Sequence, residues 1–199
     1  MVKSLAFIAF LVVAWFAYSR INPPITYPPG VLLAGDPTQN APPDEVPFDY
    51  GKFQLKPLAT FVLDARVLHR KNYHYDLGAS LVPVDLAVGW GRMSDQAVLD
   101  QLKISQASRF YYYEYPHQPP IPKEEIISHS TNLHLIPSTD EIAARCKSLR
   151  TGELVHHSGL LVQATGPDIG TWTSSLSRTD SAKGACELVW VEEIHRVAH

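Results

Sequence analysis

Alternation of apolar and polar residues is the feature of this chain that most restricts its fold. From Phe53 to Val67 every second residue is apolar, and Pro57 is the one interruption. A period of two sends neighbouring side chains to opposite faces of a strand, so this segment predicts one long strand with a face in the core. Proline has no backbone N–H to donate, so we expect the strand to bend or bulge at Pro57.

Two helices are predicted among the remaining segments. Ser94 can cap a helix from Asp95 to about Ile104, in which apolar residues recur at helical spacing. The second helix follows the capping box Ser138–Glu141, whose side chains can accept hydrogen bonds from the first free amide groups. Gly152 then marks the point beyond which that helix cannot continue.

The other segments are predicted to be extended. Residues 81–88 contain Pro83, which favours an edge strand or a buried loop. Further strands are expected at residues 109–115 and 125–136, and in a final meander at 153–163, 171–177 and 187–194. The sequence therefore predicts a strand-rich α+β domain with two short helices. Its sheet would be a small β-barrel or a half-open OB-like sheet, behind an N-terminal hydrophobic helix.

The amino terminus carries an apolar segment, residues 5–18, between Lys3 and Arg20. It is shorter than the roughly 20 residues that cross a bilayer, which favours a signal peptide cleaved near Ser19. Aromatic residues at its exit instead favour an uncleaved anchor, and a cytosolic amphipathic tail is the third alternative. We expect a single-pass inner-membrane anchor with the domain facing the periplasm; after cleavage the domain would be periplasmic.

Eight prolines follow within residues 21–52. Proline fixes the backbone in extended conformations, so this part of the chain is expected to be either a free spacer or a coil wrapped along the domain. Residues 31–33 are apolar and could dock on the domain. The expected organisation is an anchor or signal at residues 1–20, a linker at 21–52, and one globular domain at 53–199.

Composition excludes some partners and leaves the redox state open. The net charge of −3 and pI near 6.3 give no basic surface, so no nucleic acid is expected, and no cofactor-binding motif is present. The two cysteines, Cys146 and Cys186, are a candidate disulfide in an exported domain. Two buried thiols are the alternative.

The stretch from His129 to His134 is the most chemically suggestive. On a strand, Ser130, Asn132 and His134 would share one face while His129 points to the other. A zinc site needs three or four ligands, and His157 is a further candidate, so a metal site would require a bulge or loop. The two interpretations are a metal-assisted hydrolase built on His129, Asn132 and His134, and a polar face of hydrogen-bonded side chains.

Other candidate binding residues are aromatic or paired charges. Trp90 lies between two glycines and is the aromatic that we most expect to be exposed, although a tryptophan filling a turn is the simpler interpretation. Arg178 and Asp180, near Trp172, could clamp a carboxylate or order a loop. The tyrosines at 111–113 could offer a stacking platform to an oligomer, as OB-like folds do.

Several stretches of the chain resemble those of a known group of proteins. They are residues 28–31, 85–95 and 129–137, together with the ending 174–180 and 184–187. With these stretches the chain resembles a group of uncharacterised bacterial membrane-anchored proteins. The resemblance implies one strand-rich exported domain behind a single anchor, and it implies no activity.

The sequence lacks a recognisable nucleophile motif, so we expect binding rather than catalysis. The leading hypothesis is a membrane-tethered, periplasm-facing domain that binds a protein partner or an envelope component. The alternatives are the metal-assisted hydrolase and an OB-like module that binds an oligomer through Trp90 and the tyrosine strand.

Overall fold

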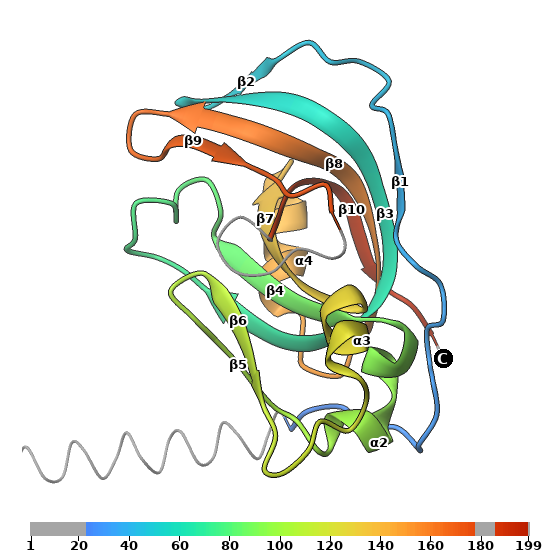
Figure 1. Ribbon diagram of the computed structural model, residues 1–199. Helices are drawn as coiled ribbons and strands as arrows, with labels where there is room; N and C mark the ends of the chain where they lie inside the picture. Colours follow the sequence, from blue (N-terminus) through green and yellow to red (C-terminus); the bar gives the residue numbers. More distant parts are fainter. Residues whose placement is uncertain (1–22, 178–185, 199) are drawn as a thin grey trace, which may run out of the picture.

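Five strands form a closed ring at the centre of the structure (Figure 1). The computed structural model describes residues 23–177 and 186–198. Around the ring the strands pair in the order β3 (Phe53–Asn72), β4 (Val84–Gly89), β7 (Ser130–Pro137), β10 (Glu187–Arg196) and β8 (Leu154–Gly166), and β8 pairs again with β3. Only the β7–β10 pair is parallel among these. The fold is strand-rich α+β, and the ring is uneven because β3 and β8 are far longer than β4.

Strand β3 confirms the prediction drawn from the alternating pattern and extends beyond it to Asn72. Its buried and exposed residues alternate over most of its length, as a half-buried strand requires. The pairing with β8 shifts register between Pro57 and Ala59, which is the irregularity expected at the proline. Three short strands border the ring: β1 (Thr38–Asn40) and β2 (Phe48–Tyr50) pair with β3, and β9 (Gly170–Thr173) pairs with β8.

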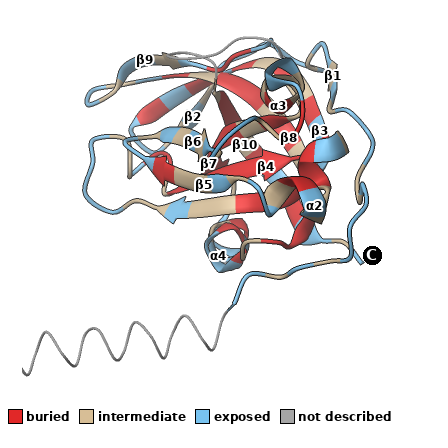
Figure 2. Ribbon diagram, turned by 60° about the horizontal axis from the view of Figure 1, so that its bottom comes forward, coloured by how far each residue is buried: buried red, intermediate tan, exposed pale blue. Residues whose placement is uncertain are grey.

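All five ring strands contribute to the largest hydrophobic cluster, and buried residues are concentrated on them (Figure 2). Helix α4 (Asp140–Ser148) adds Ile142 and Cys146 to this cluster. The helix begins within one residue of the predicted start, with Thr139 rather than Ser138 as its cap: the Thr139 hydroxyl accepts a hydrogen bond from the Ile142 amide at 3.2 Å. His157 lies in the same core, against the ring of Phe61.

A second layer covers the opposite face of β3, β4 and β7. It consists of the β5 (Lys103–Ala107) and β6 (Phe110–Glu114) hairpin with helices α2 (Gln96–Leu99) and α3 (Lys123–Ser128). Its apolar residues pack on Leu68 and Ala87 of the ring. The hairpin turn, Ser108 and Arg109, has φ of 51° and 70°, values that two-residue hairpin turns need and that residues other than glycine seldom adopt.

Several predicted elements are corrected by the structure. Residues 81–88 are predicted to be an edge strand or a buried loop, yet β4 is a fully buried inner strand, because Pro83 precedes its first paired residue and removes no ladder hydrogen bond. The predicted extended segment 125–136 begins instead with α3, whose first turn holds Glu124 and Glu125, favourable charges at that end. The final strands do not form a meander, since β10 pairs with β8 and β7 rather than with β9.

The first predicted helix is also shorter than expected. It ends at Leu99, and from Lys103 the chain joins the hairpin, so pairing with β6 overrides local helical propensity. Asp95 caps α2, while the Ser94 hydroxyl accepts hydrogen bonds from the amides of Leu32 and Leu33 at 3.0 and 3.1 Å. The expected capping residue is thus used to hold another segment.

That segment is the start of the proline-rich chain, which lies along the domain. The Ile25 amide donates to the Thr151 carbonyl at 2.9 Å, and the Gly91 amide donates to the Leu33 carbonyl at 2.7 Å. Gly152, with φ of +92°, packs directly against Ile25. Residues 25–33 therefore form one wall of the folded unit. Within the described residues no helix is long and apolar enough to cross a membrane, and residues 5–18 lie outside them.

The two cysteines lie in different elements. Cys146 is buried in the core face of α4, where burial raises the pKa of its thiol to about 12. Cys186 directly precedes β10. Among the described residues both are thiols, so the disulfide suggested by the sequence is not part of this structure.

Burial of His157 predicts a sensitivity to acid. Its side chain is enclosed by the core, and neither ring nitrogen has a hydrogen-bond partner among the residues that the structure describes; burial lowers its pKa to about 4 from an ordinary value of 6.5. Between these values the unfolded chain binds a proton that the folded chain does not, so stability falls as pH drops from 6.5 to 4, by about 3 kcal/mol in total.

Urea unfolding at pH 7 and pH 4.5 measures this effect. The His157→Leu variant should lose less stability between the two pH values than the natural protein does. His195→Leu, at an exposed position of β10, should behave as the natural protein. Equal pH dependence for all three proteins would contradict the assignment.

Candidate functional site

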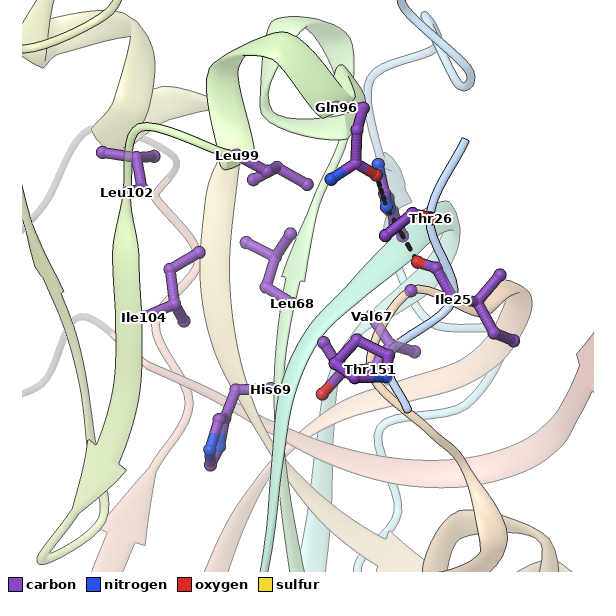
Figure 3. Close-up of a pocket in the computed structure, with 13 residues that line it drawn as sticks. Ile25, Thr26, Val67, Leu68, His69, Gln96, Leu99, Leu102, Ile104 and Thr151 are labelled. Carbon is purple, nitrogen blue, oxygen red and sulfur yellow. Dashed lines mark hydrogen bonds between the residues drawn. The ribbon is translucent and has the colours of Figure 1, made fainter. Parts of the chain in front are cut away.

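A pocket opens between the N-terminal segment, β3, α2 and β5 (Figure 3). Its volume is about 430 Å³, within the range of small-molecule sites. One wall is apolar and is formed by Leu68, Leu99, Leu102 and Ile104. The facing wall includes Ile25 and Thr26, so the proline-rich segment is part of the pocket (Figure 3).

Arg66 is the cationic side chain of this pocket and is only 2% exposed. Its Nη1 donates to the Ser94 carbonyl at 3.0 Å, and its Nη2 donates to the Ile25 carbonyl at 3.1 Å and to Oε1 of Gln96. The guanidinium also lies 5.0 Å from the centre of the Tyr27 ring. Burial lowers the pKa of Arg66, an effect that the neighbouring Tyr27 and acidic residues oppose. Arg66 thus ties the N-terminal segment and α2 to the ring.

A chain of hydrogen bonds leads away from the other end of the pocket, where His69 lies (Figure 3). Nδ1 of His69 is 2.8 Å from Oε1 of Gln106, which accepts its proton. Gln106 donates through Nε2 to Oδ1 of Asn132, and Asn132 donates through Nδ2 to the Arg109 carbonyl at 3.1 Å. Each donor therefore points from the pocket toward the hairpin turn.

A buried ionic cluster begins at that turn. Asp85 is fully buried, and its Oδ1 accepts hydrogen bonds from Nδ1 of His134 and from Nη1 of Arg109, both at 2.9 Å. Asp85 and His134 are direct partners on β4 and β7. Arg109 also binds Asp76 through two nitrogens and stacks 3.6 Å from the Tyr73 ring centre. These contacts hold the left-handed turn and fix the His134 ring with its proton on Nδ1.

The predicted histidine cluster is only partly brought together. Asn132 and His134 share a face of β7 as predicted, and both reach the Asp85–Arg109 cluster. His129 precedes the strand; its Nδ1 is 2.8 Å from the Ser128 hydroxyl, and its ring lies by Trp90. His157 is in the core. Among the described residues no three His, Cys, Asp or Glu side chains are placed to hold a metal ion.

The predicted aromatic sites also differ from expectation. Trp90 is 1% exposed, which contradicts the exposed tryptophan and agrees with the simpler interpretation of a buried one, and its indole N–H donates to Oδ1 of Asp36 at 2.9 Å. The reason is that Trp90 is still extended, with φ of −134° and ψ of −175°, and continues the inward-facing row of Leu86 and Val88. Trp172 of β9 makes an edge contact with the His134 ring, their centres 4.8 Å apart. Arg178 and Asp180 lie outside the described residues.

The structure adds residues that the sequence pattern did not single out as a site: Arg66, His69, Asp85 and Gln106. Two of them carry a signal that is visible in the sequence. Asp85 is the one charged residue between Leu81 and Val88, and Arg66 interrupts an otherwise apolar run from Ala65 to Leu68. A charged residue inside an apolar run is costly to bury unless it is paired and hydrogen-bonded, so each of these two residues is expected to have such a partner.

Comparison of the chain with protein-family models, with curated proteins and with solved structures gives no match. The resemblance to bacterial membrane-anchored proteins therefore stays a prediction. The pocket and the Asp85–Arg109 cluster are the features from which a function can be argued.

Removing Arg109 should strongly destabilise the fold, because it would leave the buried Asp85 carboxylate without its cationic partner. We expect Arg109→Met to cost about 3 kcal/mol in urea unfolding, and the double variant with Asp85→Asn to recover part of this loss. Arg145→Met removes an exposed ion pair with Glu141 and should change stability by less than about 1 kcal/mol. A double variant as unstable as the sum of its parts would argue against the pairing.

Proposed function

We propose that this chain is a membrane-tethered, periplasm-facing domain that binds a small component of the cell envelope. The pocket carries the proposal, because it combines an apolar wall with few polar groups, as ligand sites do. Its location also supports the choice of ligand, since residues 24–26 form a wall and follow closely after the apolar segment at 5–18. Binding rather than catalysis is the activity that we propose.

The tether and the pocket are close in the chain. From Tyr18 to Pro23 the chain can extend at most about 18 Å. Arg150 donates to the Pro23 carbonyl at 2.8 Å, so contact with the domain begins at the first described residue. If residues 5–18 insert in a bilayer, the domain would lie beside the membrane surface rather than at the end of a long spacer.

For the ring we propose the architecture of a small OB-like barrel, supported by five strands that pair in a closed order. The oligomer-binding alternative has less support, because Trp90 is buried; Phe110 and Tyr112 are its remaining exposed aromatics on β6. The metal-assisted hydrolase also has less support, because His129 and His134 make separate contacts.

The orientation can be tested with a reporter fused after Ile21. A phosphatase that folds only outside the cytosol should be active in this fusion, because the positive amino end is expected to stay inside. A fusion in which the reporter directly follows Ser4 lacks the apolar segment, so it should be inactive and serves as the control. Activity of a cytosolic reporter alone at the same position would overturn the tether and its orientation.

The pocket can be tested with a neutral fluorescent apolar probe, N-phenyl-1-naphthylamine. After the fluorescence of the probe in empty phosphatidylcholine nanodiscs is subtracted, the full-length protein in such nanodiscs should bind it saturably. Leu102→Trp, which fills the pocket, should weaken binding about tenfold, a loss of about 1.4 kcal/mol. Leu77→Trp, at an exposed position outside the pocket, should bind as the natural protein does. Identical binding by the three proteins, or none by any, would overturn the pocket as a binding site.

A further inference from the structure

The hydrogen bonds that the structure gives Arg66 go to neutral groups. A guanidinium has five N–H bonds, and those that Arg66 uses go to two carbonyl oxygens and one amide oxygen, all neutral. Its Nε is buried without an acceptor among the described residues. No ion pair links Arg66 to a carboxylate of those residues.

The nearest acidic side chains are engaged elsewhere. Oδ1 of Asp95 accepts hydrogen bonds from the amides of Gly30 and Ala97, both at 2.9 Å. Oδ1 of Asp100 accepts from Nε2 of Gln96 at 2.7 Å. The charges of Asp95 and Asp100 offset part of the cost of burying Arg66, and an anion in direct contact with its guanidinium would offset more of it.

Gln96 occupies the position where such an anion would bind. Its Oε1 accepts from both Nη2 of Arg66 and the amide of Tyr27. A carboxylate or phosphate oxygen would accept the same hydrogen bonds with a full negative charge, and planar guanidinium groups bind such oxygens in pairs. Rotation of the Gln96 side chain away from Arg66 would open this position to the pocket.

We infer that the pocket binds a single-chain amphiphile taken from the membrane, with its anionic headgroup on Arg66 and its apolar chain on Leu68, Leu99, Leu102 and Ile104. This inference rests on the proposed function, since it names the ligand class of the same pocket. Charge complementarity selects the headgroup, and the leucine-rich wall opposite Gln96 and Ile25 selects the apolar chain (Figure 3). The membrane is the source because the wall at residues 24–26 directly follows the proposed anchor.

Two ligands with the same alkyl chain, one anionic and one neutral, distinguish the effect of the headgroup charge on binding from that of the apolar chain. Dodecanoate and dodecanol, each below the concentration at which it aggregates, are titrated against N-phenyl-1-naphthylamine bound to the full-length protein in phosphatidylcholine nanodiscs. Dodecanoate should displace the probe at a concentration at least tenfold lower than dodecanol. Equal displacement by both, or displacement by neither, would overturn the anionic ligand class. The proposed function would fail separately, if the neutral probe itself did not bind.

A charge variant tests the role of Arg66 without removing it. Gln96→Glu places a carboxylate on Arg66, at the loss of the hydrogen bond that Gln96 donates to Asp100, so it should abolish the preference for dodecanoate over dodecanol. Gln101→Glu adds the same charge to an exposed position one turn away and should keep the preference. A Gln96→Glu protein that still prefers dodecanoate tenfold would overturn the assignment of Arg66 as the anion partner.

Discussion

Strand β3 pairs with two other strands of the ring, and the closure of the ring depends on this double pairing. Its first part pairs with β8 and its last part with β4, and Arg66 is the residue that is paired with both, opposite Leu154 and Gly89. A strand of 20 residues is about 66 Å long when straight, too long for a domain of this size. The irregularities after Pro57 and after Val67 let it curve, so the ring closes.

The location of Arg66 follows from that closure. Ala65 and Val67 belong to the ring core, so the strand period directs Arg66 to the opposite face, where α2 and the N-terminal segment pack. The guanidinium of Arg66 therefore donates to the Ile25 carbonyl of the N-terminal segment, and to the Ser94 carbonyl and the Gln96 side chain at the start of α2. The pocket, its cationic wall and the docking of residues 25–33 thus depend on the same point of β3.

Features set by neighbouring residues were predictable from the sequence. The alternation in residues 53–67 predicted β3 and its bulge, and the capping box predicted α4. Period two also predicted that Asn132 and His134 share a face. What that face contacts was not predictable, because Asp85 and Gln106 come from other strands whose pairing is set by long-range packing. The helix α3 and the inner position of β4 were missed for the same reason.

The close packing at Gly152 has a consequence for how the N-terminal segment could be detached. A Cβ atom at this position would lie 1.9 Å from the Ile25 carbonyl oxygen, in backbone that cannot yield as a side-chain tip can. The side chain of any larger residue would clash with the Ile25 backbone and push it away from the loop that follows α4. One methyl group there would force the leading segment away from the body of the protein.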